Sequence, residues 1–309
     1  MVLLIGTGPS GHPAAGTAPA GGSPAVVHVD LDGLEDIGGA HGWTFDRHDA
    51  EAFFSDAIER GLGFFDAHDI KATWFVIGEH LRNPSRLTLL RSLVQRGHTV
   101  GSHTMTHRPL TRLTSAEKQD EIARSREVIS DSLGAAVDGF RAPGFYVDRE
   151  VLEMVAEAGY QYDTSLHADP HVRRDSALHE GPEGRWRLTG EHEAIELFLP
   201  RRRPLPFPFH PSYSLILGTW YFRLGLYLAG RGPVPLVLLF HLTDFARTPI
   251  RSAATWQQRV FTLSAVSGDE KARRCAAMVR AVQRRYRFVR TGDVLHRELS
   301  SPGDGEDRP

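Results

Sequence analysis

The chain has 309 residues and a mass of 34.3 kDa, which suits one large α/β domain or two small ones. Its formal net charge is −2, so no general attraction to nucleic acid is implied, and we expect no nucleic-acid partner. A single cysteine, Cys275, excludes an internal disulfide and a cysteine-based metal site.

Residues 1–24 are rich in Gly, Pro, Ala and Ser, and this composition predicts a disordered arm. Its opening apolar residues are too few for a signal peptide and no basic residue precedes them, so we expect a cytoplasmic protein. Residues 6–11 match the pattern Gly-x-Gly-x-x-Gly. Pro13 and Pro19 oppose the helix that a dinucleotide site needs, which disfavours a nucleotide-binding α/β protein.

Beyond the arm, strands and helices alternate with the period of βα units, which predicts a parallel sheet. Capping residues mark helix starts at Asn83-Pro84 and at the Thr114/Glu117 pair. The expected strands are 26–32, 71–78, 98–102, a strand ending at 141, 160–163, 194–199, 235–241 and 288–290. The expected helices are 46–67, 83–95, 114–133, 148–158, 214–229 and 270–286, followed by a loose tail at 300–309.

His103 and His107 stand four residues apart, a spacing that places both on one face of a helix or helical turn. Neutral imidazole is the commonest metal ligand in proteins, and two converging imidazoles supply half of a zinc-like shell. The alternative is a chance pair, because the chain has sixteen histidines.

Asp30 and Asp32 follow an apolar, β-branched run, and strand alternation points both side chains the same way. Two such carboxylates repel unless a cation lies between them, so one could bind a metal while the other stays free as a base. The alternative is a solvated acidic junction that also holds Glu35 and Asp36.

Two further stretches end in polar residues. An apolar approach runs into Arg141 and a Pro-Gly turn, and the continuous apolar run 235–240 ends in His241. The carboxyl end of a buried strand is where α/β folds build active sites. The alternatives are an ordinary surface ion pair for Arg141 and a hydrogen-bonded core histidine for His241.

Taken together and in order, these motifs resemble the polysaccharide deacetylases, carbohydrate esterase family four, and their metal-dependent relatives that act on other C–N bonds. The resemblance covers roughly residues 26–295 and is strongest up to residue 163. The motifs are the Asp-bearing strand, residues 72–78, Gly-His-x-x-Gly-Ser-His-x-x-x-His at 97–107, Arg-x-Pro-Gly at 141–144, and the strand ending in His241. The resemblance implies a distorted (β/α) barrel with parallel strands over residues 25–299, with its metal at the carboxyl ends of the strands.

The family resemblance also implies roles for individual residues. A divalent metal, zinc by ligand type although cobalt, nickel or manganese also suit, is held by Asp32, His103 and His107. Asp30 is the expected base and His241 the acid that protonates the leaving amine, on opposite sides of the scissile bond. The supporting roles are orientation of the base by Arg141, an oxyanion contact from the Gly144 backbone N–H, an acyl-pocket wall from Leu239 and support of the catalytic histidine by Asp163.

The expected activity is removal of an N-acyl group, acetyl in the first place, from an amino sugar or glycan. The alternatives are a formamido sugar or small cyclic amide as substrate, or a metal-containing barrel that binds sugar without hydrolysis. Two departures from the family pattern leave choices open. Leu31 separates the two Asp residues, so base and ligand can be exchanged, and Leu166 and His167 stand where a Trp is expected, which leaves the acyl group open.

A last hypothesis concerns residues 201–229. Arg201, Arg202 and Arg203 precede two Phe residues in a proline-rich loop and an apolar helix with Trp220 and Tyr227. Basic residues attract anionic head groups and aromatic residues favour the lipid boundary, which predicts a peripheral membrane contact. The alternative is a buried helix on the barrel with a merely solvated Arg triplet. The oligomeric state is left open.

Overall fold

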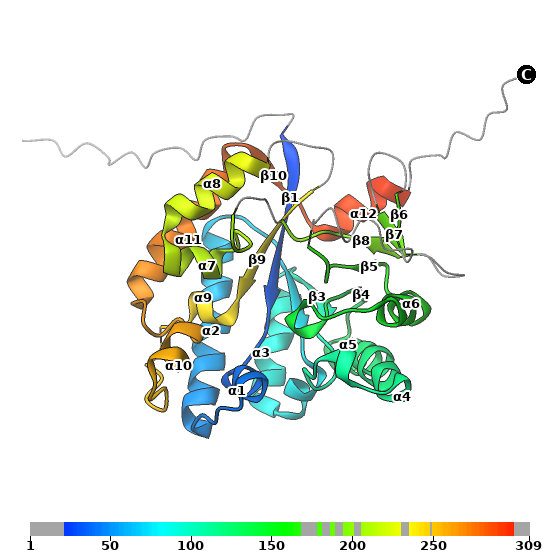
Figure 1. Ribbon diagram of the computed structural model, residues 1–309, viewed down its shortest axis with the longest axis horizontal. Coiled ribbons are helices and arrows are strands. Elements are labelled where there is room, and N and C mark those ends of the chain that lie inside the picture. Colours follow the sequence, from blue (N-terminus) through cyan, green and yellow to red (C-terminus); the bar gives the residue numbers. More distant parts are fainter. Residues whose placement is uncertain are drawn as a thin grey trace, which may run out of the picture.

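The computed structural model describes residues 22–167, 178–180, 186–188, 194–200, 205–229, 235–247 and 249–299. The predicted arm, apart from its last three residues, the Arg201–Arg203 triplet and the tail at 300–309 lie outside these residues. The described part is a curved sheet surrounded by helices (Figure 1).

Eight strands of this sheet are mutually parallel: β10 and the seven strands in the order β9-β1-β2-β3-β4-β5-β8. Strands β7 and β6 extend the sheet in antiparallel fashion beyond β8, and β10 pairs with the start of β1. The predicted distorted (β/α) barrel with parallel strands is therefore confirmed. The strands are β1 (Ser23–Asp30), β2 (Thr73–Val76), β3 (Thr99–Ser102), β4 (Val137–Phe140), β5 (Tyr162–Asp163), β6 (Leu178–Glu180), β7 (Trp186–Leu188), β8 (Ile195–Glu196), β9 (Leu236–His241) and β10 (Tyr286–Phe288).

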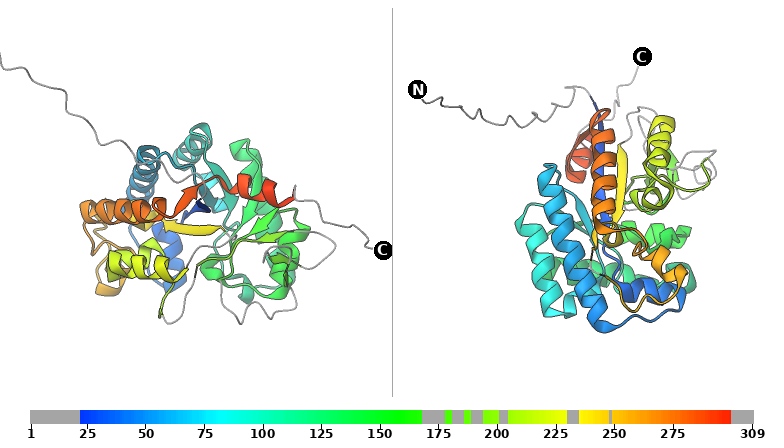
Figure 2. Two further views of the ribbon diagram at one scale, coloured as in Figure 1. Left: turned by 90° about the horizontal axis from the view of Figure 1, so that it is seen from above. Right: turned by 90° about the vertical axis from the view of Figure 1, so that its left-hand side faces the viewer.

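Helices cover the outside of the sheet, with α8 and α11 on the β9 side and α4 to α6 beyond β4 (Figure 2). The α-helices are α1 (Leu34–His41), α2 (Arg47–Ala67), α3 (Pro84–Gln95), α4 (Ser115–Gln119), α5 (Ser125–Leu133), α6 (Arg149–Glu157), α7 (Pro211–Leu217), α8 (Thr219–Ala229), α9 (Leu242–Phe245), α10 (Trp256–Phe261), α11 (Gly268–Gln283) and α12 (Thr291–Leu299). Shorter turns are η1 (Gly78–Arg82), η2 (Leu110–Arg112), the π-helical η3 (Asp120–Arg124) and η4 (Pro143–Phe145).

Strand β1 shows how alternation divides the core. Val27 and Val29 belong to the large apolar cluster that includes Phe53 of α2, while Val26 packs on the other face of the sheet with Leu239. His28 and Asp30 share the parity of Val26, so they follow it along the barrel interior toward the carboxyl end of the strand. The interior is thus apolar at its base and polar at its mouth.

Several helix starts follow their capping residues as predicted. Asn83 accepts hydrogen bonds from two backbone N–H groups of α3, and the Thr114/Glu117 capping box opens α4. The predicted helix 214–229 is wrong in one respect, because Gly218 adopts a φ of 98° and divides it into α7 and α8. A side chain at that φ would be strained, so glycine allows the break.

Candidate metal centre and active site

The loop after β3 carries both predicted histidine ligands. It is not the helical turn that the sequence spacing suggested, because Thr104 and His107 have left-handed φ values of 67° and 57°. These two residues fold the loop back so that His103 and His107 face the same point, with ring centroids 5.0 Å apart. The convergence is as predicted, but its cause is loop geometry rather than helical periodicity.

A buried carboxylate holds this loop in place. Glu121 lies in the π-helical stretch η3, is 1% exposed, and accepts hydrogen bonds from the backbone N–H groups of Met105 and Thr106 at 2.9 and 2.8 Å. It also accepts from the Thr106 hydroxyl. π-Helical turns inside α-helices are frequent at functional sites, and here the turn places Glu121 under the ligand loop.

Three side-chain atoms converge at the mouth of the barrel. Asp32 Oδ1 lies 3.3 Å from His103 Nε2 and 3.2 Å from His107 Nε2. Asp32 Oδ1 is buried, and its contacts lack the geometry of hydrogen bonds. Ligands placed tetrahedrally about 2.0–2.1 Å from a zinc ion are about 3.3–3.4 Å from one another, so the spacing fits a shared cation.

The surroundings of His103 fix its ring in an orientation that suits metal binding. His103 Nδ1 lies 2.7 Å from the carbonyl oxygen of Arg141, so Nδ1 carries the proton and donates it. The Nε2 lone pair is thereby left for a metal, which is the usual arrangement around a metal-bound imidazole. The donor set of one carboxylate and two imidazoles therefore fits a divalent ion.

The charges at this point are strongly coupled. Burial raises the pKa of Asp32, but the imidazoles of His107 and His103 outweigh it and hold that pKa well below its ordinary value. Burial lowers the pKa of His107, yet the Asp32 carboxylate raises it to about 9. The ionised Asp32 carboxylate therefore stabilises positive charge placed between these three side chains.

Two other groups of acidic and imidazole side chains come together, but each has a structural role. In the group Glu35, Asp36 and His80, Arg86 forms an ion pair with Glu35. In the group around Asp46, the Asp46 carboxylate caps α2 by accepting from two backbone N–H groups. Of the three groups, only the Asp32 group has a buried carboxylate oxygen without a hydrogen bond among the described residues.

Asp30 is held by a buried arginine. Arg141 is 0% exposed, and its Nη1 lies 3.3 Å from Asp30 Oδ1, so this is not a surface ion pair. Its Nη2 lies 2.7 Å from His28 Nδ1 and 3.0 Å from Thr164 Oγ1. Burial and the Arg141 charge hold the pKa of His28 well below its ordinary value, so the imidazole is neutral and accepts from Arg141.

His241 ends β9 directly beside Asp30. The two residues are paired in register, and His241 Nε2 lies 3.8 Å from Asp30 Oδ2. A gap of 3.8 Å does not hold an amide between these two atoms, and the predicted placement on opposite sides of a scissile bond stays a prediction. A substrate has to approach both from the mouth, where the His241 side chain remains 22% exposed.

The support of His241 also differs from expectation. Its Nδ1 lies 3.0 Å from Ser212 Oγ at the start of α7, and Ser212 Oγ donates to Asp244 Oδ2 at 3.1 Å. Asp244 Oδ2 also accepts from the His241 backbone N–H at 2.9 Å. No hydrogen bond joins Asp163 to His241 among the described residues, so the predicted role of Asp163 is wrong, and Ser212 with Asp244 occupies that position.

Asp163 instead contacts Ser165, away from His241. Its carboxylate accepts from the backbone N–H and the hydroxyl of Ser165, both at 2.8 Å. Burial raises the pKa of Asp163, and burial together with Asp163 raises the pKa of Glu196 well above its ordinary value. Burial and the neighbouring Asp163 carboxylate therefore favour the protonated form of Glu196.

The last two predicted site residues, Gly144 and Leu239, lie in different parts of the barrel. Gly144 is exposed in η4 with a φ of 63°, a left-handed conformation that favours glycine. Leu239 is fully buried in the barrel interior, two residues before His241 on the same face of β9. Their oxyanion and acyl-pocket roles stay predictions.

Sequence reasoning missed several supporting residues. His28 stands two residues before Asp30, so the alternation that paired Asp30 with Asp32 also pointed to it. Asp244 stands three residues after His241, at the spacing of a capping box, which the structure contains. Ser212 and Glu121 carry no local signal, because they reach the site through the tertiary fold.

Comparison with known proteins agrees with this geometry. The sequence model of the family described as "Polysaccharide deacetylase" matches residues 39–162. The chain is 29% identical over 141 residues to a peptidoglycan deacetylase of Helicobacter pylori, covering 45% of this chain and 47% of that protein. It is 38% identical over 99 residues to a chitooligosaccharide deacetylase of Bradyrhizobium sp., covering 32% and 44%. The chain thus spans about half the length of the curated relatives that it matches.

Solved structures extend the likeness to the whole fold. A proposed polysaccharide deacetylase from Mycobacterium smegmatis has a TM-score of 0.61 at 18% identity, covering 96% of this chain and 99% of that one. Puue allantoinase has a TM-score of 0.60 at 14% identity, covering 94% and 96%. Fold and sequence match together place the chain among (β/α) barrels of the polysaccharide deacetylase type. Over residues 39–162 the chain is similar to the polysaccharide deacetylase family, and the curated relatives named above are deacetylases.

Proposed function

We propose that this protein is a metal-dependent hydrolase that removes an N-acyl group, acetyl in the first place, from an amino sugar or glycan. The observation that carries the proposal is the convergence of Asp32, His103 and His107 at the barrel mouth, with Asp30 and His241 beside them. The deacetylase relatives named above, which act on peptidoglycan and chitooligosaccharides, support a carbohydrate substrate.

The metal is proposed to be zinc, because two imidazoles and one carboxylate suit its preference, although cobalt, nickel and manganese accept the same donors. A divalent ion in this position supplies a Lewis acid that lowers the pKa of water and polarises a carbonyl group. Asp32, His103 and His107 hold it, and the Arg141 carbonyl keeps the His103 ring oriented.

The remaining residues handle protons and orientation. Asp30 accepts the proton of the attacking water, and Arg141, fixed by His28 and Thr164, keeps that carboxylate aimed at the mouth. His241 protonates the leaving amine, and the hydroxyl of Ser212 holds its ring. Because Asp30 and His241 are adjacent, the amide has to lie across both, with its acyl group toward Leu239 and its oxygen near the Gly144 N–H.

The test is a substrate panel with purified, metal-loaded protein. Chitooligosaccharides, peptidoglycan fragments, a formamido sugar and a cyclic amide are incubated with wild type and with Asp30→Asn, and free amine and free acid are quantified. The proposal predicts amine and acetate in equal amounts from an N-acetylated sugar, with little from Asp30→Asn. Ring opening of the cyclic amide alone would contradict the sugar assignment, and sugar binding without any product would contradict hydrolysis.

A further inference from the structure

Helices α7 and α8 present an apolar face to solvent. At positions 220, 224, 227 and 228 of α8, helical spacing places the side chains on one side, with Trp220 62% and Tyr227 69% exposed. The opposite side of α8 packs Phe222 into the core. The large apolar residues exposed on α7 and α8 in this face, here called the α7–α8 face, are Ile216, Leu217, Trp220, Leu224, Tyr227 and Leu228.

The buried-helix interpretation accounts for only the inner half of these helices. Between residues 211 and 229 the sequence has a single charged residue, Arg223, which is exposed on the same side of α8 as Trp220 and Tyr227. The outer half therefore carries one charge, fewer than a solvated helix normally carries. Contiguous exposed apolar surface of this kind marks an interaction site.

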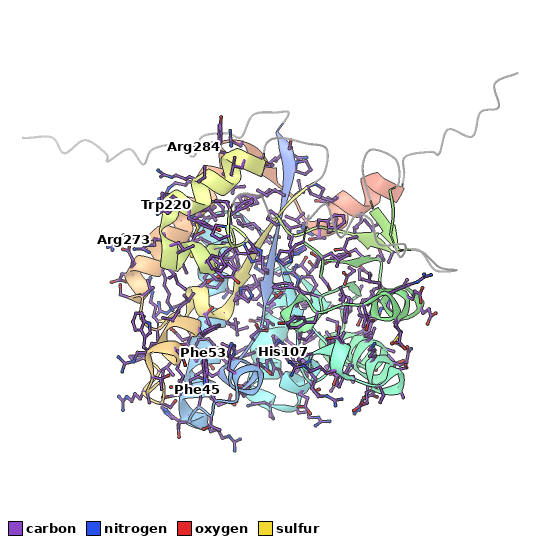
Figure 3. The ribbon with its side chains drawn as sticks, in the orientation of Figure 1. Phe45, Phe53, His107, Trp220, Arg273 and Arg284 are labelled. Carbon is purple, nitrogen blue, oxygen red and sulfur yellow. The ribbon has the colours of Figure 1, made fainter. Side chains whose placement is uncertain are left out.

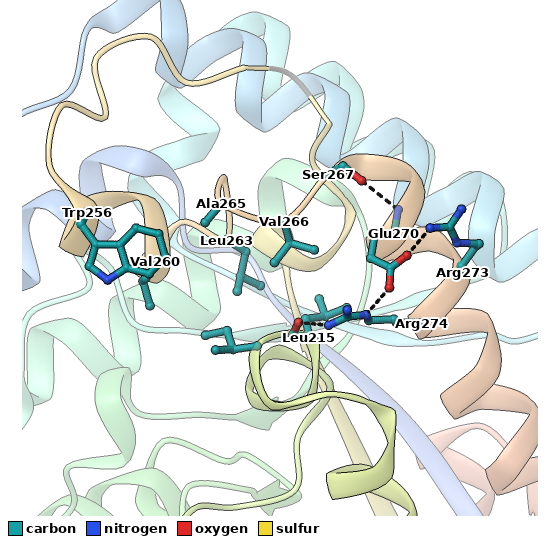
Figure 4. A pocket seen from close by; sticks show the side chains of 11 residues that line it. Leu215, Trp256, Val260, Leu263, Ala265, Val266, Ser267, Glu270, Arg273 and Arg274 are labelled. Carbon is teal, nitrogen blue, oxygen red and sulfur yellow. Dashed lines mark hydrogen bonds and ion pairs between the residues drawn. The ribbon is translucent and has the colours of Figure 1, made fainter.

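A groove beside α7 extends the same apolar surface. It has a volume of about 470 Å³ and lies between α7, α10 and α11 (Figure 4). Ile216 lines it from the α7–α8 face, and Trp256, which is 71% exposed, lines it from α10. Its other apolar lining residues are Leu215, Val260, Leu263, Ala265 and Val266.

Arginines border this surface. Arg274 Nη1 donates to the Leu215 carbonyl of α7 at 2.5 Å, and Arg285 Nη1 donates to the Leu226 carbonyl of α8 at 3.0 Å, with its guanidinium 5.8 Å from the Tyr227 ring. Exposed Arg273 and Arg280 continue the border along α11, and exposed Arg284 follows at its C-cap. Arg273 and Arg284 lie on the edge of the molecule that also carries Trp220 (Figure 3).

This border concentrates positive charge. Residues 268–287 contain six arginines, besides the buried Lys271, against two acidic residues, Asp269 and Glu270, although the whole chain has a net charge of −2. Glu270 pairs with Arg273 and Arg274. Positive charge beside an exposed aliphatic and aromatic face is complementary to a surface that is anionic outside and apolar inside.

We propose that the α7–α8 face and its arginine border bind the surface of a lipid bilayer that contains anionic lipid. Trp220 and Tyr227 lie at the head-group level, the leucines enter the acyl boundary, and Arg280 and Arg284 contact anionic head groups. The contact is peripheral, because no helix in the described part of the chain is long and apolar enough to cross a membrane.

Two other occupants fit less well. Pairing of two copies through this face would set one arginine border against the other, and like charges oppose such a contact. A sugar surface would be expected to use aromatic rings among polar groups, whereas the face carries Ile216, Leu224 and Leu228. Because Ser212 of α7 holds His241, a membrane on this face would lie next to the element that supports the active site.

The test is flotation of the full chain with neutral phosphatidylcholine vesicles and with vesicles containing phosphatidylglycerol. Wild type should float with the anionic vesicles and be released by high salt. Trp220→Ser/Tyr227→Ser should lose most binding, and Arg280→Gln/Arg284→Gln should weaken it by roughly tenfold or more, since each cation near the surface contributes. The matched control Arg82→Gln/Arg149→Gln removes the same charge from η1 and α6 and should bind as wild type.

Two results would overturn the proposal. One is a flotation result without the expected differences. Either wild type floats equally with neutral and anionic vesicles, or Trp220→Ser/Tyr227→Ser floats with anionic vesicles as well as wild type does. The other is a concentration-dependent dimer that Trp220→Ser/Tyr227→Ser dissociates, which would assign the face to a second copy. The readout is binding alone, so the proposal stands or falls separately from hydrolytic activity.

Discussion

His28 Nδ1 accepts a hydrogen bond from Arg141 Nη2 at 2.7 Å, and this contact joins the interior of the barrel to its mouth. On the far side of the ring, His28 Nε2 lies 3.2 Å from Thr291 Oγ1 of α12. On the near side, Arg141 contacts Asp30, and Asp30 lies beside His241. The orientation of the proposed base therefore depends on a neutral imidazole that never reaches the mouth.

His28→Ala should therefore lower turnover by removing this support. It leaves an Arg141 N–H buried without a partner, at a cost of about 1–3 kcal/mol in unfolding free energy. The matched control is His98→Ala, since His98 is also buried and accepts from the Ala72 backbone N–H, far from Asp30. Both variants should lose stability, but only His28→Ala should lose kcat in steady-state kinetics. Equal kcat losses would contradict a positioning role.

Asp30→Asn should keep the metal yet lose turnover by about a hundredfold or more, the usual contribution of a positioned base. The carboxamide keeps the size of the side chain, but it removes the charge that pairs with the buried Arg141, so some unfolding free energy should be lost. Metal analysis and kcat are measured on the same sample, with Asp32→Asn alongside. Loss of the metal from Asp30→Asn but not from Asp32→Asn would show that Asp30 is the metal ligand and Asp32 the base.

Ser212→Ala should reduce kcat by about tenfold, because the His241 ring loses the hydroxyl that orients it. Ser212→Thr retains a hydroxyl and should restore most of the rate. Asp244→Asn should resemble Ser212→Ala, since Asp244 accepts from both Ser212 and the His241 backbone. A larger kcat loss in Asp163→Asn than in Asp244→Asn would indicate that Asp163, and not Asp244, supports His241.

Glu196 gives the protein a defined pH dependence. Burial and the Asp163 carboxylate raise its pKa in the folded protein, so the folded chain keeps a proton that the unfolded chain releases above its ordinary pKa of 4.5. The stability that this proton contributes is fully present below that value and is lost as pH rises through the folded pKa. Glu196→Gln should therefore flatten the decline of unfolding free energy from pH 5 to 8. An unchanged slope in Glu196→Gln, like that expected for the exposed control Glu79→Gln, would contradict the raised pKa of Glu196.

Much of the barrel could be predicted because its signals are local. Apolar runs, the Asn83 and Thr114 caps and the period of βα units placed the strands and helices that carry Asp30, His103 and Arg141. Gly218 shows the limit, because a single left-handed residue divided a continuous apolar segment into α7 and α8. The neighbouring residues carry no sequence signal for a helix break at this position.

The candidate site was predictable where a residue chemically suited to the site follows a strand end, as with Asp32, His103 and His241. It was not predictable where support arrives from a distant element. Ser212 lies 29 residues from His241 in sequence and meets it only because α7 packs against β9. Asp163 illustrates the reverse error, since family analogy placed it on His241 and the fold places it beside Glu196.

We propose that one divalent metal at Asp32, His103 and His107 drives N-deacylation. The most direct measurement strips the protein with a chelator and then titrates zinc while following acetate release from a chitooligosaccharide, with His103→Ala and His80→Ala in parallel. We predict that activity in wild type and His80→Ala rises to a plateau at about one equivalent, while His103→Ala binds little zinc and stays inactive. Activity that survives chelation, or zinc binding that His80→Ala abolishes and His103→Ala does not, would contradict the account.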